Sequence, residues 1–295
     1  MELPVIHPKS RPDGAAPIFL KIGIVGLGLI GGSIALAARQ KWPSALVIAV
    51  DNKDVLETAI RLHAIDVAAD DLVVLAEADL VIFAAPVRQN LSLLDELDAN
   101  VRQPAVVTDT GSTKRDMVMA ARRLPPRFTF VGGHPLGGAV TRGLTNARPD
   151  LFRDRPWLLT PEGERGGEAL EKLLAFVGAL GARPRVLDAK AHDRLMAFLS
   201  HLPQLTVSAL MRVVGDAVGD DGLALAGRGL VTTTRLASSA PGIWKDIAAT
   251  NVDEIGQALD TLIALLRDLR QDLADGDRLS EIFGEAQAWR KQLPQ

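Results

Sequence analysis

Two hydrophobic patterns divide this chain. From residue 20 to about 185, short apolar runs rich in Val and Ile alternate with longer segments of mixed character. This alternation is typical of βαβ units and predicts a largely parallel sheet. We expect helices between the runs, as in LGLIGGSIALAARQ and TKRDMVMAARRL. The strand-sized runs are KIGIVGLG, ALVIAVD, ADLVIFAAP, AVVTDTG, FTFVGG, RPWLLTP and ARPRVLD.

From Asp188 onward the apolar residues recur with a helical period over long segments. We therefore predict an α/β domain over residues 19–185 and an all-helical domain over residues 186–295. Residues 1–18 contain several prolines and charges of both signs, so we expect a flexible leader there. Near the C-terminal end, six apolar residues on one helix face could form a core or a dimer seam. They are Ile255, Leu259, Leu262, Ile263, Leu266 and Leu269.

A charge-free run of 17 residues, from Ile22 to Ala38, has a composition that a hydropathy scan could assign to a membrane span. It contains five glycines and is shorter than the ~20 apolar residues that cross a bilayer. Its first half is β-like and a glycine cluster follows, which favours a strand, a turn and a helix. We expect no membrane segment and no membrane partner.

The composition excludes several classes of protein. With 33 Lys and Arg against 36 Asp and Glu, the formal net charge is -3, so the chain has no basic excess to hold nucleic acid. The absence of cysteine rules out disulfides, thiolate zinc sites, iron–sulfur clusters and cysteine nucleophiles, and it is compatible with the cytoplasmic location that we expect. The absence of tyrosine means that no phenol can act as an acid or base.

The motif GLGLIG at residues 26–31 follows the strand-like IGIV and opens the helix-like SIALAAR. In a dinucleotide-binding Rossmann turn, Gly26 makes the tight bend and Gly28 lets backbone amides approach a pyrophosphate. Gly31 allows the helix to pack closely on the strand, and the helix N-terminus offers N–H groups to the phosphates.

Asp51 ends the second strand-like run, where a carboxylate binds ribose hydroxyls and repels a 2′-phosphate. This favours NAD over NADP, although Lys53 could offset the repulsion and leaves NADP open. The alternative interpretation is a glycine-rich turn with a capping Asp. The cofactor-binding residues that we predict are Gly26, Gly28, Leu29, Ile30, Gly31, Asp51 and Pro86.

Polar residues follow two later strand-like runs, Ser112 after AVVTD and His134 after FTFVGG. If both strands are parallel to the first, these residues lie at the sheet edge where ligands bind. A neutral imidazole held there by a hydroxyl can remove a proton from a substrate alcohol as hydride leaves the same carbon. The alternatives are a structural loop histidine for His134 and a helix N-cap for Ser112.

In the helical half, His201, Gln204 and Ser208 lie on one face of an apolar helix. Such a polar stripe must be satisfied by protein, water or ligand. Pro203 lies within it and cannot donate to the carbonyl of Leu199, so we expect a kink beside His201. The alternative for His201 is a buried histidine whose partners are internal.

Arg235 is the only charged residue between Gly229 and Trp244. A guanidinium in such a segment needs an anion, and a substrate carboxylate suits its bidentate geometry. A structural ion pair with Asp246 is the competing interpretation.

Six ordered segments together resemble the prephenate/arogenate (cyclohexadienyl) dehydrogenase family of tyrosine biosynthesis. The resemblance runs from about residue 20 to 290, nearly the whole chain. The segments are GIVGLGLIGGSIALAAR, VTDTGSTK, GGHPLGG, LF..RPWLLTP, HDRLMAFLSHLPQ and TTTRLASS..GIWKDI.

The resemblance implies a Rossmann dinucleotide-binding domain, a following all-α dimerisation domain and a homodimer. It also implies NAD-dependent oxidative decarboxylation of prephenate to 4-hydroxyphenylpyruvate, with no metal. His134 matches the family's catalytic histidine and Ser112 the serine that positions it. The substrate-binding residues that the resemblance implies are His201, Gln204, Arg235 and Trp244.

Two positions depart from the family pattern. Many prephenate-using members have a second histidine where this chain has Gln204, and several place a carboxylate in the loop 137–147, which here carries Arg142. Arogenate, alone or together with prephenate, therefore stays open as the substrate. Remoter alternatives are a two-domain imine or hydroxy-acid oxidoreductase and a non-catalytic NAD-sensing protein.

Overall fold

The computed structural model describes residues 16–137 and 143–293. Most of the leader expected over residues 1–18, and Arg142 in the loop 137–147, lie outside the described residues. The chain forms two compact units. The first unit comprises Met1–Met196 and Ser238–Thr250, and the second unit comprises Ala197–Ala237 and Asn251–Gln295. The boundary at residue 185 remains a sequence-based prediction.

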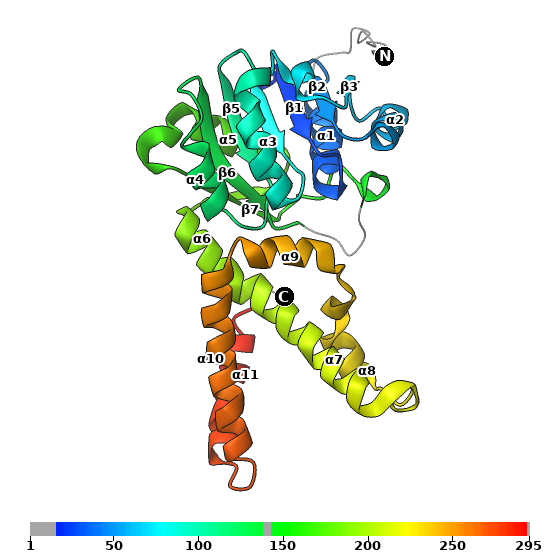
Figure 1. Ribbon diagram of the computed structural model, residues 1–295, viewed down its shortest axis with the longest axis vertical. Coiled ribbons are helices and arrows are strands. Elements are labelled where there is room, and N and C mark those ends of the chain that lie inside the picture. Colours follow the sequence, from blue (N-terminus) through cyan, green and yellow to red (C-terminus); the bar gives the residue numbers. More distant parts are fainter. Residues whose placement is uncertain (1–15, 138–142, 294–295) are drawn as a thin grey trace. The chain divides into compact units, whose positions relative to one another are not determined.

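The first unit is built on one eight-stranded sheet with the order β3-β2-β1-β4-β5-β6-β7-β8 (Figure 1). Neighbouring strands are parallel except β6 and β7, which pair antiparallel. The largely parallel sheet predicted from the hydrophobic pattern is therefore confirmed. The strands are β1 (Lys21–Val25), β2 (Leu46–Val50), β3 (Val67–Ala69), β4 (Leu80–Phe83), β5 (Ala105–Asp109), β6 (Phe128–Pro135), β7 (Pro156–Pro161) and β8 (Arg183–Val186).

Helices cover both faces of this sheet, because its strands are apolar on both sides. Buried side chains of α1, α2 and α5 pack on one face, and those of α3 and α4 pack on the other. The α-helices of the first unit are α1 (Leu29–Lys41), α2 (Lys53–Arg61), α3 (Val87–Asn100), α4 (Arg115–Ala121), α5 (Gly167–Ala179), α6 (Ala189–Met196) and α9 (Pro241–Ala249). Short 3₁₀ helices are η1 (Leu72–Leu75), η2 (Leu144–Asn146) and η3 (Gly163–Gly166).

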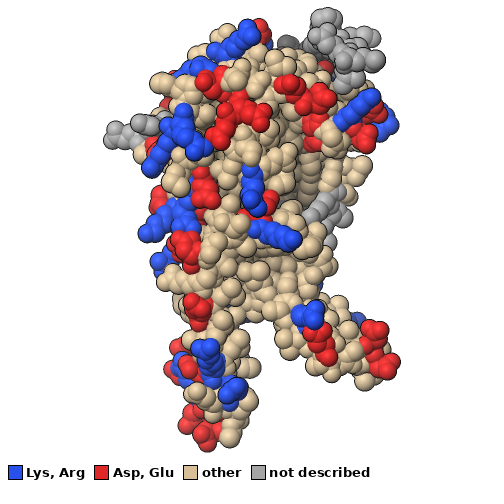
Figure 2. Space-filling view, in the orientation of Figure 1, with Lys and Arg blue, Asp and Glu red and all other residues tan. Residues whose placement is uncertain are grey.

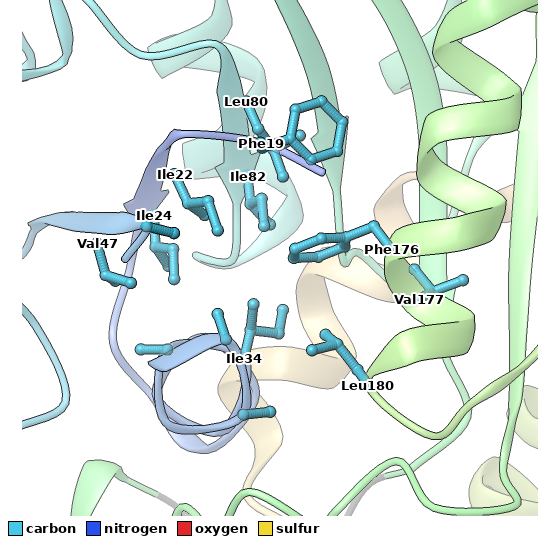
Figure 3. Close-up of a cluster of buried hydrophobic side chains, with 14 of the residues drawn as sticks. Phe19, Ile22, Ile24, Ile34, Val47, Leu80, Ile82, Phe176, Val177 and Leu180 are labelled. Carbon is cyan, nitrogen blue, oxygen red and sulfur yellow. The ribbon is translucent and has the colours of Figure 1, made fainter. Parts of the chain in front are cut away.

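Phe176 of α5 lies at the centre of the first of these two cores. In Figure 3 its ring lies near Ile82 of β4, and it stacks on Trp42 with ring centroids 5.2 Å apart. Phe19 meets the same ring edge-on at 5.7 Å. Each of these aromatic side chains is at most 3% exposed, so the contact fixes α5 to the strands that carry the glycine loop.

The second unit is helical throughout its described secondary structure. Its elements are the π-helical turn η4 (Ala197–His201), α7 (Leu202–Leu223), α8 (Arg228–Thr233), α10 (Val252–Gln271) and α11 (Asp277–Arg290), and the short 3₁₀ helix η5 (Arg235–Ser238) begins at its edge. The π turn stands where the sequence predicts a kink, next to Pro203, which has no N–H to donate to the carbonyl of Leu199. The break in the helical backbone of α7 itself lies at Gly219, with φ +60°.

The apolar face of α10 loses burial along its length. Ile255 is 6% exposed, whereas Ile263 and Leu266 are 42% and 52% exposed. The first residue therefore belongs to a core within the chain. The later residues remain available to a dimer seam, the second interpretation offered by the sequence.

No described helix is both long and apolar enough to cross a membrane. In Figure 2, acidic and basic side chains are interspersed over the visible face. The charge-free run from Ile22 to Ala38 forms the buried strand β1, the glycine loop and most of α1, as predicted.

Candidate active site

The glycine loop between β1 and α1 has the geometry that the motif predicts. Gly26 has φ +95°, and a Cβ there would lie 2.8 Å from the backbone nitrogen of Ala85. A Cβ on Gly31 would lie 1.9 Å from the carbonyl oxygen of Gly26, so only glycine lets α1 approach β1 this closely. A Cβ on Gly28 would meet no atom within 4 Å, which leaves open space above the loop.

The N-terminus of α1 is open to an anion. Its N-cap is Gly28, no side chain caps the first turn, and the first turn contains no acidic residue. The helix dipole and the first N–H groups therefore act on the open space without a competing carboxylate. Asp51 stabilises the loop instead, because its carboxylate accepts hydrogen bonds from the N–H groups of Leu27 (2.6 Å) and Asn52 (2.6 Å).

A pocket of about 500 Å³ adjoins this loop at the carboxyl ends of β1, β2 and β4. It brings together four of the predicted cofactor residues, Gly26, Gly28, Asp51 and Pro86. Leu29, Ile30 and Gly31 form the first turn of α1 and are not among the lining residues, and neither is Lys53. The other lining residues are Val25, Val50, Asn52, Asp70, Ala84, Ala85, Gln89 and Leu93.

Asp70, which the sequence motifs did not indicate, also lies in this pocket, directly after β3. Its strand is three half-buried residues long and has no run of large apolar side chains, so the hydrophobic pattern gave no signal. The pocket thus contains two carboxylates, those of Asp51 and Asp70, and a glycine-lined entrance to a helix N-terminus. Carboxylates accept hydrogen bonds from ribose hydroxyls and helix N–H groups donate to phosphates, so this combination of groups fits a dinucleotide whose ribose carries free hydroxyls.

Ser112 and His134 lie at the carboxyl ends of the neighbouring strands β5 and β6, which are parallel to β1 as expected. Both side chains are half-buried. His134 is still within β6, where it pairs with Leu158 of β7, so it is held by the sheet and not by a turn beyond it. The N-cap alternative for Ser112 is wrong, because α4 begins at Arg115 with Lys114 as its N-cap.

A second histidine contacts His134. The Nδ1 atom of His134 lies 2.9 Å from Nε2 of His192, and Nδ1 of His192 lies 2.8 Å from Oδ1 of Asp193. The side chains of His192 and Asp193 are fully buried. Neither residue was predicted to have a role, although both stand in the segment HDRLMAFLSHLPQ. An adjacent His-Asp pair was the available signal.

The carboxylate of Asp193 also binds the start of α4. It accepts hydrogen bonds from the N–H groups of Lys114 (2.7 Å) and Arg115 (3.0 Å) and from Nε of Arg115 (3.2 Å). Burial acts to raise the pKa of Asp193, but the hydrogen bonds from His192 and from these backbone groups hold the pKa below its ordinary value. Burial lowers the pKa of His192, although Asp193 favours its charged form. The pair is therefore an ionised carboxylate beside a neutral imidazole.

A buried ion pair lies beneath the same loop. The ammonium of Lys114 contacts Oδ2 of Asp109, and both side chains are fully buried. The Asp109 carboxylate also accepts hydrogen bonds from the N–H groups of Gly111 (2.8 Å) and Gly133 (3.0 Å). It thus joins the loop that carries Ser112 to the strand that carries His134.

Two glycines of β6 make room for this pair. A Cβ on Gly132 would lie 2.3 Å from Oγ1 of Thr160 and 3.1 Å from Cδ of Lys114. A Cβ on Gly133 would lie 2.5 Å from the carbonyl oxygen of Asp109. The GG preceding His134 is therefore a packing requirement of the buried polar cluster.

Trp244 lies half-buried on α9 in the first unit. Thr250, the C-cap of α9, shares a 2.7 Å hydrogen bond between hydroxyls with Thr113. Helix α9 is thereby joined to the loop that contains Ser112.

The second unit carries the other predicted substrate residues. His201 is 1% exposed, and its Nδ1 atom lies 3.3 Å from the amide nitrogen of Asn251, which fits the interpretation of a buried histidine with an internal partner. Gln204 is 4% exposed and donates to the carbonyl of Leu236 (2.8 Å) and to Ser208 (3.2 Å). The amide of Gln204 therefore fixes the backbone beside Arg235, whose side chain is exposed at the start of η5.

Comparison with known proteins identifies both parts of the chain. Residues 34–186 match the family model described as prephenate dehydrogenase, nucleotide-binding domain. Residues 188–285 match the one described as prephenate dehydrogenase, dimerization domain. The second description assigns the helical part to dimer formation in this family.

Individual relatives agree. The chain is 34% identical over 279 residues to prephenate dehydrogenase of Bacillus subtilis, covering 92% of this chain and 75% of the relative. It is 31% identical over 283 residues to cyclohexadienyl dehydrogenase of Zymomonas mobilis, covering 94% and 97%. A crystal structure of prephenate dehydrogenase from A. aeolicus, in complex with hydroxyphenyl propionate and NAD+, shares the fold with a TM-score of 0.86 at 24% identity, covering 97% and 100%. By both family models and by these relatives, the chain belongs to the prephenate dehydrogenase family.

Proposed function

We propose that this protein is an NAD-dependent dehydrogenase that converts prephenate to 4-hydroxyphenylpyruvate by oxidative decarboxylation, in the biosynthesis of tyrosine. The observation that carries the proposal is a half-buried, hydrogen-bonded histidine, His134, on the same sheet edge as a glycine loop with an open pocket. The matched dimerization domain supports a homodimer. We also propose that the protein is located in the cytoplasm, because a biosynthetic enzyme of this kind uses free NAD.

The chain's own residues fit the dinucleotide. Gly26, Gly28 and the first turn of α1, with Leu29, Ile30 and Gly31, would hold the pyrophosphate by backbone N–H groups. Asp51 and Pro86 would line the remainder of the pocket, with Asp51 facing the ribose. When bound, NAD supplies the acceptor for the hydride that leaves ring carbon C4 of the substrate.

His134 would take the proton of the C4 hydroxyl, and Ser112 would position that hydroxyl and the imidazole. As the O–H bond breaks, its electron pair forms the C4 carbonyl while hydride departs from C4. The ring carboxylate then leaves as CO2, the electron pair of that bond completes the aromatic ring, and the C4 oxygen regains from His134 the proton that makes it a phenol. Because aromatisation drives the reaction, the protein needs only to orient C4, to accept one proton and to return it.

Four further residues would bind the substrate. Arg235 has the charge and geometry for a bidentate contact with a carboxylate. Gln204 donates a hydrogen bond to the carbonyl of Leu236, the residue after Arg235, and would thereby fix the backbone that carries the guanidinium. His201 and Trp244 would supply the remaining polar and aromatic contacts.

A second candidate is a dehydrogenase of dual specificity that also accepts arogenate. It is favoured by the Zymomonas mobilis relative, whose name is cyclohexadienyl dehydrogenase and which the chain matches over 97% of its length. Gln204 supports the same candidate, because prephenate and arogenate differ only in whether the side chain carries a keto or an ammonium group, and an amide oxygen can accept a hydrogen bond from an ammonium.

The test is the formation of NADH by the purified protein with prephenate or arogenate in parallel. We expect turnover with prephenate, and the variant His134→Asn should lower kcat by about 10²–10⁴ with little change in KM. His63→Asn is the matched control, because His63 is exposed and has φ +54°, a conformation that Asn also adopts. No NADH from either substrate would refute the function, and near-normal turnover by His134→Asn would refute the role of the histidine.

A further inference from the structure

We propose that His192 is a positioning residue that fixes His134 as the Nδ1–H tautomer and leaves Nε2 of His134 as the proton acceptor. The inference rests on the proposed function, in which His134 is the base. It adds two residues, His192 and Asp193, to those that govern the reaction.

The geometry of three side chains supports this role. Asp193 Oδ1, His192 and His134 form one line of hydrogen bonds, with separations of 2.8 Å and 2.9 Å. The inner two members are fully buried, and His134 at the outer end is half-buried at the sheet edge. The chain of contacts therefore runs from the interior to the position where a substrate would meet His134.

The direction of each hydrogen bond follows from the charges. An ionised carboxylate only accepts, so Nδ1 of His192 must carry the proton that faces Asp193. A neutral His192 then has a lone pair on Nε2, which can only accept from Nδ1–H of His134. A neutral His134 has a single ring proton, so its Nε2 atom carries the lone pair.

The surroundings of His192 keep it neutral. The charged groups that face it are Asp193 on its own helix, and Lys114 and Asp109 from the loop and strand packed against it. Burial and the ammonium of Lys114 oppose a positive charge on His192, whereas the two carboxylates favour one. Burial prevails and the pKa of His192 lies below its ordinary value, so at neutral pH the ring is an acceptor toward His134.

Capping of α4 alone would not require this histidine. Asp193 reaches the N–H groups of Lys114 and Arg115 directly, without His192. His192 is the group that connects the carboxylate to His134, and a buried imidazole with both nitrogens engaged transmits the orientation of one ring to the next.

The contact should also strengthen His134 as a base. When His134 takes up a proton at Nε2, its Nδ1–H still donates to His192, and this hydrogen bond stabilises the charged form and so raises the pKa of His134, the donating ring. Loss of His192 should therefore lower the pKa of His134 and also free its ring to adopt the unproductive tautomer.

The experiment compares His192→Leu, which removes the acceptor, with His192→Gln, whose amide oxygen retains one. Met196→Ala is the structural control, because Met196 is 1% exposed one turn along the same helix and its loss disturbs packing without touching the hydrogen bonds. Each protein is assayed for NADH formation from prephenate across pH, and thermal unfolding verifies that each folds.

We expect His192→Leu to lower kcat about 10- to 100-fold at unchanged KM and to shift the acidic limb of kcat/KM downward by roughly 0.5–1 pH unit. His192→Gln should retain more activity than His192→Leu, and Met196→Ala should keep the wild-type limb. The proposal would be overturned if His192→Leu kept the wild-type kcat and the wild-type acidic limb in the pH profile of kcat/KM. It would also be overturned if His192→Leu and His192→Gln lost kcat equally.

A measurement on the wild-type protein needs no variant to fold. Long-range ¹H–¹⁵N spectra, assigned with His134→Asn and His192→Gln, should show the proton of His134 on Nδ1, and a proton on Nε2 would contradict the inference. The two levels of the proposal remain separable. If His134→Asn loses turnover while His192→Leu does not, only the role of His192 fails; if His134→Asn remains active, the proposed base fails first.

Discussion

Replacement of Lys114 by Met should destabilise the first unit strongly. The ammonium of Lys114 and the carboxylate of Asp109 are both fully buried and in contact, and Met has nearly the shape of the lysine stem without its charge. The substitution therefore leaves a buried carboxylate that has lost its counter-ion. Removal of one partner from such a pair costs about 3–5 kcal/mol, because an isolated charge is poorly solvated in the interior.

The structure places the expected cost at the lower end of that range. Asp109 keeps two backbone donors, the N–H groups of Gly111 and Gly133, which still solvate part of its charge. Burial also lowers the pKa of Lys114, although Asp109 and Asp193 oppose this. The charged ammonium therefore has a desolvation cost in the folded protein, and the Met variant does not have this cost. We expect a loss of about 3 kcal/mol, which for a unit of this size lowers Tm by about 6–12 °C.

Thermal unfolding followed by tryptophan fluorescence measures this loss, because Trp42 and Trp157 are buried in the first unit. Lys172→Met is the matched control: Lys172 pairs with Glu168 on an exposed helix face, and its loss should leave Tm unchanged. The double variant Asp109→Asn/Lys114→Met should be more stable than the two single losses added together. Wild-type Tm in Lys114→Met, or simple additivity in the double variant, would refute the reasoning.

Three further outcomes follow from the site. Asp51→Ala should raise the relative kcat/KM for NADP, because it removes a pocket carboxylate that repels a 2′-phosphate; an unchanged NAD/NADP ratio would assign the preference to another group. Arg235→Gln should raise KM for prephenate about 10-fold or more with a smaller effect on kcat, and an unaltered KM would exclude a carboxylate contact. Since burial lowers the pKa of His192, the unfolded chain takes up its proton first as pH falls through about 6.5, so stability declines below that pH. Between about pH 7.5 and 5.5 the Tm of the wild type should therefore fall more than that of His192→Gln, and parallel curves would contradict a neutral buried ring.

The strands of the first unit could be predicted because most of them are buried on both faces. Seven runs of Val, Ile and neighbouring apolar residues were identified in the sequence, and each forms a strand. The remaining strand, β3, was missed because it has only three residues, which are half-buried and include two alanines, so it shows no run of large apolar side chains. The antiparallel pairing of β7 with β6 could not be predicted from the hydrophobic pattern either, since strand direction depends on the connecting loop and not on the hydrophobicity of the run.

The site was predictable where its geometry is local. The glycine loop, Asp51 and Pro86 each come shortly after a strand in the sequence. The ends of these strands can be recognised from the hydrophobic pattern, so these residues could be predicted. His192 meets His134 across 58 positions and Asp193 meets Lys114 across 79, so no spacing rule could pair them. Only the packing of α6 against α4 and β7 brings these residues together.

The buried polar cluster couples the stability of the first unit to its chemistry. Asp109 binds the N–H of Gly133, the residue before His134, and Asp193 binds both α4 and the histidine that contacts His134. The oxygens of these two carboxylates therefore accept hydrogen bonds from buried backbone N–H groups and at the same time hold the loop of Ser112 and the ring of His134 in place. Substitutions at Asp109 or Asp193 should then lower Tm and turnover together, whereas His134→Asn, at the half-buried outer end, should lower turnover alone. Because the interior charges are fixed by folding itself, the base is already oriented before any substrate arrives.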